Sequence, residues 1–191
     1  IREILLVSSR YDAFILEEDG PLSERLFGEY SELSLSWFPR ILHAENGSQA
    51  LELLRERRFD LVLTTTRLPD TDALSLAQKV KQCDPKMPVV LLTFSDADLK
   101  RFPDGLDTTA IDHVFQWSGD VRILITINKL LEDARNTQHD VHIAGVPVII
   151  VVEDSIRYYS TFLTVLYSEL VAQATSLIAE GVNNLHRALR L

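Results

Sequence analysis

Short apolar runs alternate with segments of helical periodicity along the first two thirds of the chain. The runs predict buried strands, because parallel strands covered on both faces are apolar at successive positions; they cover residues 4–7, 41–44, 61–63, 89–93 and 111–117. Apolar stripes at helical spacing follow them, over residues 21–32, 48–57, about 70–82, from 95 to about 103, and 120–131. This alternation predicts an α/β fold, a (βα)5 doubly wound parallel sheet with strand order 2-1-3-4-5.

A polar stretch and a second apolar run follow this pattern. We expect a first domain over residues 1–134, a linker over 135–145 and an incomplete second module over 146–191. The second module begins with a predicted C-terminal strand over 146–152. An apolar stripe then predicts one long helix from residue 156 to about 189.

The long helix and the strand before it have no obvious partner within so short a module. An open strand edge and a row of exposed apolar side chains would favour aggregation in a monomer. We therefore expect a homodimer or higher oligomer held mainly by this helix, with the strand covered by the neighbouring chain or by the first domain.

Composition narrows the class of protein. The 191 residues are 46% hydrophobic and 25% charged, with a net charge of −9. The negative charge argues against nucleic acid or an anionic membrane as the main partner. The single cysteine, Cys83, cannot form an internal disulfide, and no signal peptide is visible, so a cytoplasmic location is expected. The chain begins at Ile1 and ends within a helical pattern, which suggests a piece of a longer protein.

The segment 59–70 carries the most informative candidate site. A short buried strand ends there, at the edge of the sheet where open α/β folds place their chemistry. In this setting an aspartate is expected at position 65, but the chain has Thr65. A threonine hydroxyl is neither the carboxylate nucleophile that forms an aspartyl phosphate nor a strong ligand for Mg²⁺.

Motifs at 46–51, 60–63, 67–69 and 88–93 give the first 134 residues a resemblance to the receiver domain of bacterial two-component response regulators, which have a flavodoxin-like fold. The resemblance implies five functional positions: an acidic pair, a phosphoacceptor aspartate, a hydroxyl and a lysine. Carried over one by one, the acidic pair becomes Ser8 and Ser9, the phosphoacceptor Thr65, the hydroxyl Thr93 and the lysine Trp117. Only Thr93 keeps the pattern.

The loss of four positions implies a phosphorylation-incompetent pseudo-receiver that is not an enzyme and binds no metal or cofactor. An error of register, or a site rebuilt from Glu17, Glu18, Asp19 and Asp70, is the alternative. The resemblance also implies a partner surface over about 96–131. Trp117 would either fill space there or anchor a partner.

The apolar run that begins at residue 146 resembles the first strand of a second receiver domain. In that resemblance Glu153 and Asp154 form an intact acidic pair. This implies an alternative function, an active phosphorelay element whose phosphoacceptor lies beyond this chain. Two stretches, 8–20 and 152–159, also resemble the amino-terminal region of large bacterial proteins that carry tandem receiver-like modules before a phosphoenolpyruvate/pyruvate-binding phosphotransferase region. The chain would then be the regulatory head of such an enzyme.

The expected partners are therefore proteins: a second copy of the chain, other domains of the full-length protein, or a histidine kinase. His139 and His142 are a possible metal pair, but no further histidine or cysteine cluster supports it, so a solvated linker is the simpler interpretation.

Overall fold

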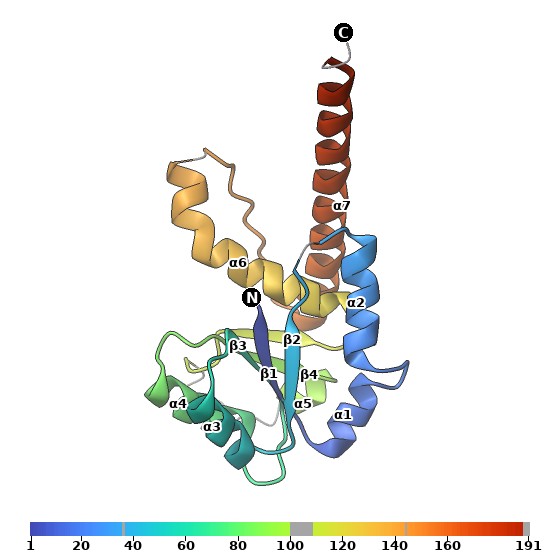
Figure 1. Ribbon diagram of the computed structural model, residues 1–191. Coiled ribbons are helices and arrows are strands. Elements are labelled where there is room, and N and C mark those ends of the chain that lie inside the picture. The colour runs from blue at the N-terminus through green and yellow to red at the C-terminus, as the bar shows by residue number, and fades with distance from the viewer. Residues whose placement is uncertain (36, 100–108, 144, 189–191) are drawn as a thin grey trace.

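A computed structural model describes residues 1–35, 37–99, 109–143 and 145–188. Its centre is a sheet of five parallel strands in the order β2-β1-β3-β4-β5, which confirms the predicted topology (Figure 1). The strands are β1 Glu3–Val7, β2 Arg40–Ala44, β3 Leu61–Thr65, β4 Val89–Thr93 and β5 His113–Gln116.

Helices cover both faces of the sheet because side chains alternate between the faces along each strand. One face packs on α1 (Arg10–Leu16), α2 (Leu22–Glu32), α6 (Arg122–His142) and the start of α7 (Ile156–Ala188). The other packs on α3 (Gly47–Glu56) and α4 (Ala73–Cys83). A short helix, α5 (Asp96–Leu99), follows β4. The expected end of that helix near residue 103 lies outside the described residues.

Side-chain caps fix where several helices begin. Asn46 accepts a hydrogen bond from the amide of Gln49 at 2.8 Å, and Asp72 accepts one from the amide of Ser75 at 2.9 Å. Each cap satisfies an amide that has no partner within the first turn. Gly47 is needed for space, because a Cβ atom there would lie 2.5 Å from the Thr71 side chain.

The structure differs from the sequence-based expectation in three segments. No helix was expected before residue 21, but Arg10–Leu16 forms α1, which Ser9 caps. The linker expected over residues 135–145 is helical as far as His142, because α6 continues where neither proline nor glycine interrupts it. The strand expected over 146–152 is absent from the described chain, where this segment forms neither strand nor helix.

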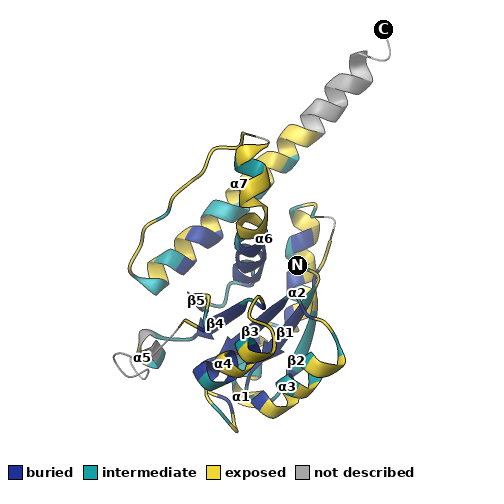
Figure 2. Cartoon of the chain, turned by 90° about the vertical axis from the view of Figure 1, so that its left-hand side faces the viewer, coloured by how far each residue is buried: buried dark blue, intermediate teal, exposed yellow. Residues whose placement is uncertain are grey.

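Helix α7 runs from Ile156 to Ala188, as the apolar stripe predicted. The expectation that this stripe has no partner within the chain is wrong for its first half. Leu163 belongs to the core of the first domain and is only 3% exposed. Beyond that contact α7 projects away from the sheet (Figure 1). The segment before α7 lies on the surface, and Figure 2 shows it exposed along most of its length.

One stretch of α7, residues 156–178, is long and apolar enough to cross a membrane by length and composition. A core helix of a soluble protein can pass the same test. In this chain more than half of the residues of the stretch are exposed, and only Ser160, Leu163 and Thr164 are buried. An insertion of this stretch into a bilayer would therefore have to break its packing on the first domain.

Candidate functional site

The carboxyl ends of β1, β3 and β4 meet at one edge of the sheet. Val7 pairs with Thr64, and Thr65 pairs with Leu92, so the residues that follow these pairs are neighbours. Four of the five positions implied by the resemblance, Ser8, Ser9, Thr65 and Thr93, therefore lie together at this edge. This arrangement agrees with the sequence-based placement.

The two serines after β1 are engaged in structural hydrogen bonds. The Ser8 hydroxyl is fully buried and lies 2.9 Å from Nε2 of His43, which is also 3.1 Å from the Ser8 carbonyl oxygen. The Ser9 hydroxyl accepts a hydrogen bond from the Asp12 amide at 3.1 Å and thereby caps α1. Both side chains are neutral and already bonded within the protein. No pattern in the sequence indicates this role of His43, which depends on the pairing of β1 with β2.

Thr65 is fully buried at the end of β3, and its hydroxyl oxygen has no partner within the described protein. The same is true of Thr66, the next residue along the chain. Thr64 differs, because its hydroxyl donates a hydrogen bond to the Thr65 carbonyl oxygen at 3.1 Å. The end of β3 thus presents hydroxyl groups at the position where the resemblance implies a carboxylate.

Thr93 and Trp117 lie at the carboxyl ends of the neighbouring strands β4 and β5. The Thr93 hydroxyl donates to the Ser95 carbonyl oxygen at 2.9 Å and accepts from the Ser95 amide at 3.2 Å. The Trp117 amide donates to the Thr93 carbonyl oxygen at 2.7 Å. The Trp117 side chain is 7% exposed and belongs to the core, so it fills space. The alternative expectation, that it anchors a partner, is wrong for this conformation.

A shallow pocket lies above this edge, bounded by the start of α1 and the segments that follow β3 and β4. Its charged lining groups are Asp12, Arg67 and Asp98. Among the described residues, no group of three or more histidine, cysteine, aspartate or glutamate side chains could hold a metal ion.

The acidic residues considered for a rebuilt site serve other roles. Asp70 accepts hydrogen bonds from the Gly47 amide, the Ser48 amide and the Ser48 hydroxyl at 2.8, 2.9 and 2.7 Å, and so caps α3. The Ser48 hydroxyl is the main influence that holds the pKa of Asp70 below its usual value. Asp19 lies 3.6 Å from the guanidinium of Arg25.

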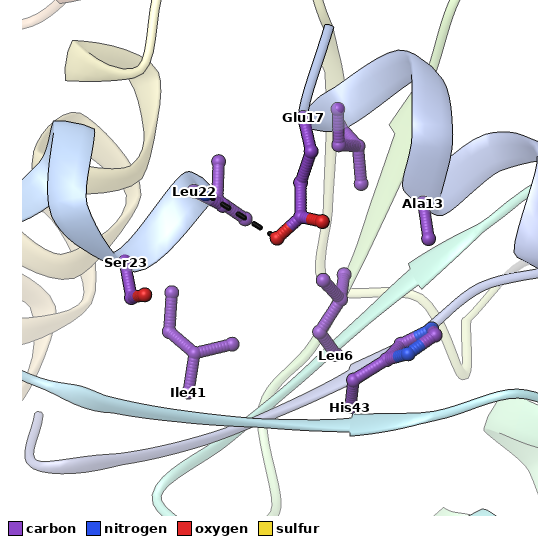
Figure 3. A pocket seen from close by; sticks show the side chains of 8 residues that line it. Leu6, Ala13, Glu17, Leu22, Ser23, Ile41 and His43 are labelled. Atoms are coloured by element: carbon purple, nitrogen blue, oxygen red, sulfur yellow. Dashed lines mark hydrogen bonds between the residues drawn. The ribbon is translucent and has the colours of Figure 1, made fainter. Parts of the chain in front are cut away.

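Glu17 lines a separate, smaller pocket between the α1–α2 break and the β1–β2 pair. Figure 3 shows its carboxylate directed at the Leu22 amide, which donates to it at 3.3 Å. Glu17 therefore helps to start α2, while Asp70 is tied to α3. Their separate roles give no support to the rebuilt metal site.

The candidates near the C-terminus lie in exposed parts of the chain. Glu153 and Asp154 precede α7, and the Glu153 carboxylate accepts a hydrogen bond from the Ser155 amide at 2.9 Å. His139 and His142 lie near the end of α6 rather than in a linker, and His139 pairs with Asp140 at 3.3 Å.

Comparison with known proteins bears on the first domain. A family model described as the response regulator receiver domain matches residues 14–128, more than half of the chain. The matched part contains Thr65, Thr93 and Trp117 but begins after Ser8 and Ser9.

Two relatives illustrate the match. The transcriptional regulatory protein ZraR of Klebsiella oxytoca is 30% identical over 106 residues, which cover 55% of this chain and 24% of that protein. The sensory transduction protein LytR of Staphylococcus haemolyticus is 27% identical over 175 residues, covering 89% of this chain and 67% of that protein. The chain thus spans only about a quarter of the length of the ZraR relative.

Solved structures confirm the fold. A two-component response regulator from Clostridium difficile is similar with a TM-score of 0.52 and 20% identity, over 71% of this chain and 99% of that one. A CheY-like receiver domain protein from Methanospirillum hungatei has a TM-score of 0.53 and 18% identity, over 72% of this chain and 98% of that one. With its sheet order and the family match over residues 14–128, this chain belongs to the response regulator receiver domain family.

Proposed function

We propose that the first domain is a phosphorylation-incompetent receiver that works as a non-catalytic interaction module in two-component signalling. The observation that supports this most directly is the buried hydroxyl of Thr65 beside the buried Ser8. Mg²⁺ prefers several oxygen ligands with carboxylates among them and gives up its water reluctantly. Neutral hydroxyls that are buried or already bonded are poor substitutes.

The carboxyl end of β5, at the same edge of the sheet, supports the proposal as well. A receiver needs a cation there to bind the phosphoryl group, and this position holds the buried indole of Trp117. The described pocket above the edge does contain Arg67, but with two carboxylates, Asp12 and Asp98, among its lining residues.

Acetyl phosphate in the presence of Mg²⁺ tests this proposal. The chain is incubated with both, and intact-mass spectrometry follows the addition of a phosphoryl group, while isothermal titration follows Mg²⁺ alone. No mass gain and no micromolar Mg²⁺ binding are expected. A phosphoryl adduct within residues 1–134, mapped by fragmentation, would overturn the proposal.

The proposed partners are proteins in the cytoplasm. Receiver domains interact with histidine kinases, and other domains of a longer protein or a second copy of the chain are further candidates. Glu153 and Asp154 precede α7 just as Ser8 and Ser9 precede α1, which favours a second receiver-like module from residue 146. That module would carry the phosphorelay alternative, or the regulatory head of a phosphoenolpyruvate-utilising enzyme. An aspartate after its third strand in the longer gene would support the phosphorelay.

A further inference from the structure

Helix α7 closes the open edge of the sheet. Strand β5 is an edge strand, so the amides on its outer side have no neighbouring strand to pair with. The Gln116 amide instead donates a hydrogen bond to the Ser160 hydroxyl at 2.8 Å, and that hydroxyl donates to the Ile156 carbonyl oxygen at 2.7 Å. A side chain of α7 thus satisfies a main-chain group of the first domain.

The apolar part of the same contact joins α7 to the core. The rings of Phe115 and Tyr159 lie 5.7 Å apart between centroids. Leu163 is buried in the same cluster of apolar side chains as Phe115. Among the described side chains of α7, Leu163 is the apolar residue that is buried, so it is the main apolar anchor.

Polar contacts continue along α7. The Tyr167 hydroxyl donates to the Asp133 carboxylate of α6 at 2.8 Å. Burial, followed by that carboxylate, raises the pKa of Tyr167, so the hydroxyl keeps its proton and remains a donor at neutral pH. Farther along, the Thr175 hydroxyl lies 2.9 Å from the Val171 carbonyl oxygen of its own helix and 3.3 Å from the Leu33 carbonyl oxygen just after α2, and it shares its one proton between them.

The segment that connects α6 to α7 is held much more loosely than α7 itself. Its described residues, 145–155, form no helix or strand, and most of them are exposed. Among the described residues, a backbone hydrogen bond between this segment and α6 runs from the Val146 amide to the Asp140 carbonyl oxygen, at 2.9 Å, and Val151 is partly buried against the core. The segment is therefore a tether with few contacts of its own to the first domain.

We propose that β5 and α6 form a helix-docking surface whose built-in occupant is the chain's own α7, so that another helix reaches this surface only by displacing α7. The surface is defined by Phe115, Gln116 and Asp133. It fits an amphipathic helix with a small hydroxyl residue, a leucine three positions later and a further hydrogen-bond donor one turn beyond, as Ser160, Leu163 and Tyr167 provide.

The tether sets how strongly α7 excludes competitors. A short flexible connection gives an effective concentration of roughly 1 mM. A free helix of equal affinity at about 10 µM would face roughly a hundredfold excess of the tethered one. The surface is thus closed in the intact chain unless a partner binds more tightly or α7 is weakened.

A labelled peptide covering residues 155–172 tests this directly. Its binding to the intact chain is measured by fluorescence anisotropy for the wild type, for Leu163→Glu and for Leu170→Glu. The last is a matched control, since Leu170 is a leucine of the same helix but is 41% exposed. Leu163→Glu should bind the peptide at least tenfold more tightly than the wild type, and hydrogen exchange at the Gln116 amide should accelerate. Leu170→Glu should behave as the wild type.

Two results would overturn the proposal. One is equal peptide binding by the wild type and Leu163→Glu, which would mean that α7 does not occupy the surface. The other is a folded Leu163→Glu chain with neither peptide binding nor faster exchange at Gln116. If circular dichroism shows that this variant is unfolded, the double variant Ser160→Ala/Tyr167→Phe replaces it. It removes the two hydrogen bonds by which these side chains join α7 to β5 and α6, without adding charge. Peptide binding no tighter than that of the wild type would in this variant also overturn the proposal.

Discussion

The hydroxyl of Ser160 accepts a hydrogen bond from the amide of Gln116, 2.8 Å away and 44 positions earlier in the chain. This bond joins a helix beyond the receiver sheet to the edge strand of that sheet. The start of α7 therefore packs as part of the first domain, although α6 and the tether separate α7 from β5 in the sequence.

The stability of the domain should therefore depend on one face of α7. Leu163→Ala should lower the free energy of unfolding by about 2–5 kcal/mol, because it leaves a cavity in the shared core. Val165→Ala, on the exposed face, should change it by less than about 0.5 kcal/mol. Urea denaturation of both variants measures the difference. Equal effects would show that α7 is not packed on the domain in solution.

Thr65→Val should stabilise the chain. The buried Thr65 hydroxyl has no partner within the described protein, and an unpaired buried hydroxyl costs about 1–3 kcal/mol. Valine has nearly the same shape and no polar atom, so an increase of about 1 kcal/mol in the free energy of unfolding is expected. Thermal or urea denaturation measures it. A loss of stability would mean that the hydroxyl bonds to a water molecule or an ion in solution.

Thr65→Asp alone should not create a phosphorylation site. It would supply the carboxylate, but Ser8 and Ser9 would remain neutral and Trp117 would still occupy the place of the lysine. The new charge would be buried without a partner, so a loss of stability is also expected. Intact-mass spectrometry after treatment with acetyl phosphate gives the answer, and a phosphorylated Asp at this position would contradict the expectation.

Asp70 should make stability depend on acid pH. Its pKa is lower in the folded chain than in the unfolded chain, mainly because of the Ser48 hydroxyl, so the ionised carboxylate stabilises the fold. This contribution is present above the unfolded pKa of about 3.9 and is lost as the pH falls through the lower folded value. Asp70→Asn should therefore lower the free energy of unfolding at pH 7. Its effect should be smaller at pH 3. An equal effect at both pH values would mean that the charge of Asp70 is unimportant.

Self-association should involve the outward face of α7. Leu163 is buried within the chain, whereas Phe162 and Val165 line an exposed apolar groove together with residues 149–153. We expect light scattering at tens of micromolar to show dimers for the wild type and monomers for Phe162→Glu/Val165→Glu. Monomeric wild-type protein would remove the homodimer from the list of partners.

The sheet could be predicted well because each strand is recognisable from a few consecutive residues. Runs such as 61–63 and 89–92 are apolar at every position, and the order of the strands follows from their alternation with helices. The second half of α6 could not be found this way, since its residues after Leu131 are mostly exposed and carry no apolar stripe. The extended segment before α7 has the composition of a strand, but a strand also needs a neighbour, which composition does not provide.

The candidate site was predictable to a similar extent. The motifs placed Ser8, Thr65 and Thr93 at one edge of the sheet, and the structure brings them together there. The partner of Ser8, the imidazole of His43, was not predictable, because 35 positions separate them and only the pairing of β1 with β2 brings them close. The Ser160–Gln116 bond was missed for the same reason.

The length of α7 gives its contacts with the first domain a mechanical consequence. Beyond Thr175, the last of those contacts described above, the helix continues to Ala188, a distance of roughly 20 Å at 1.5 Å per residue. If the anchored part tilted by about 10°, a rigid helix of that length would move its far end sideways by roughly 3 Å. A small rearrangement at the edge of the receiver sheet would thus become a larger displacement at the far end of α7.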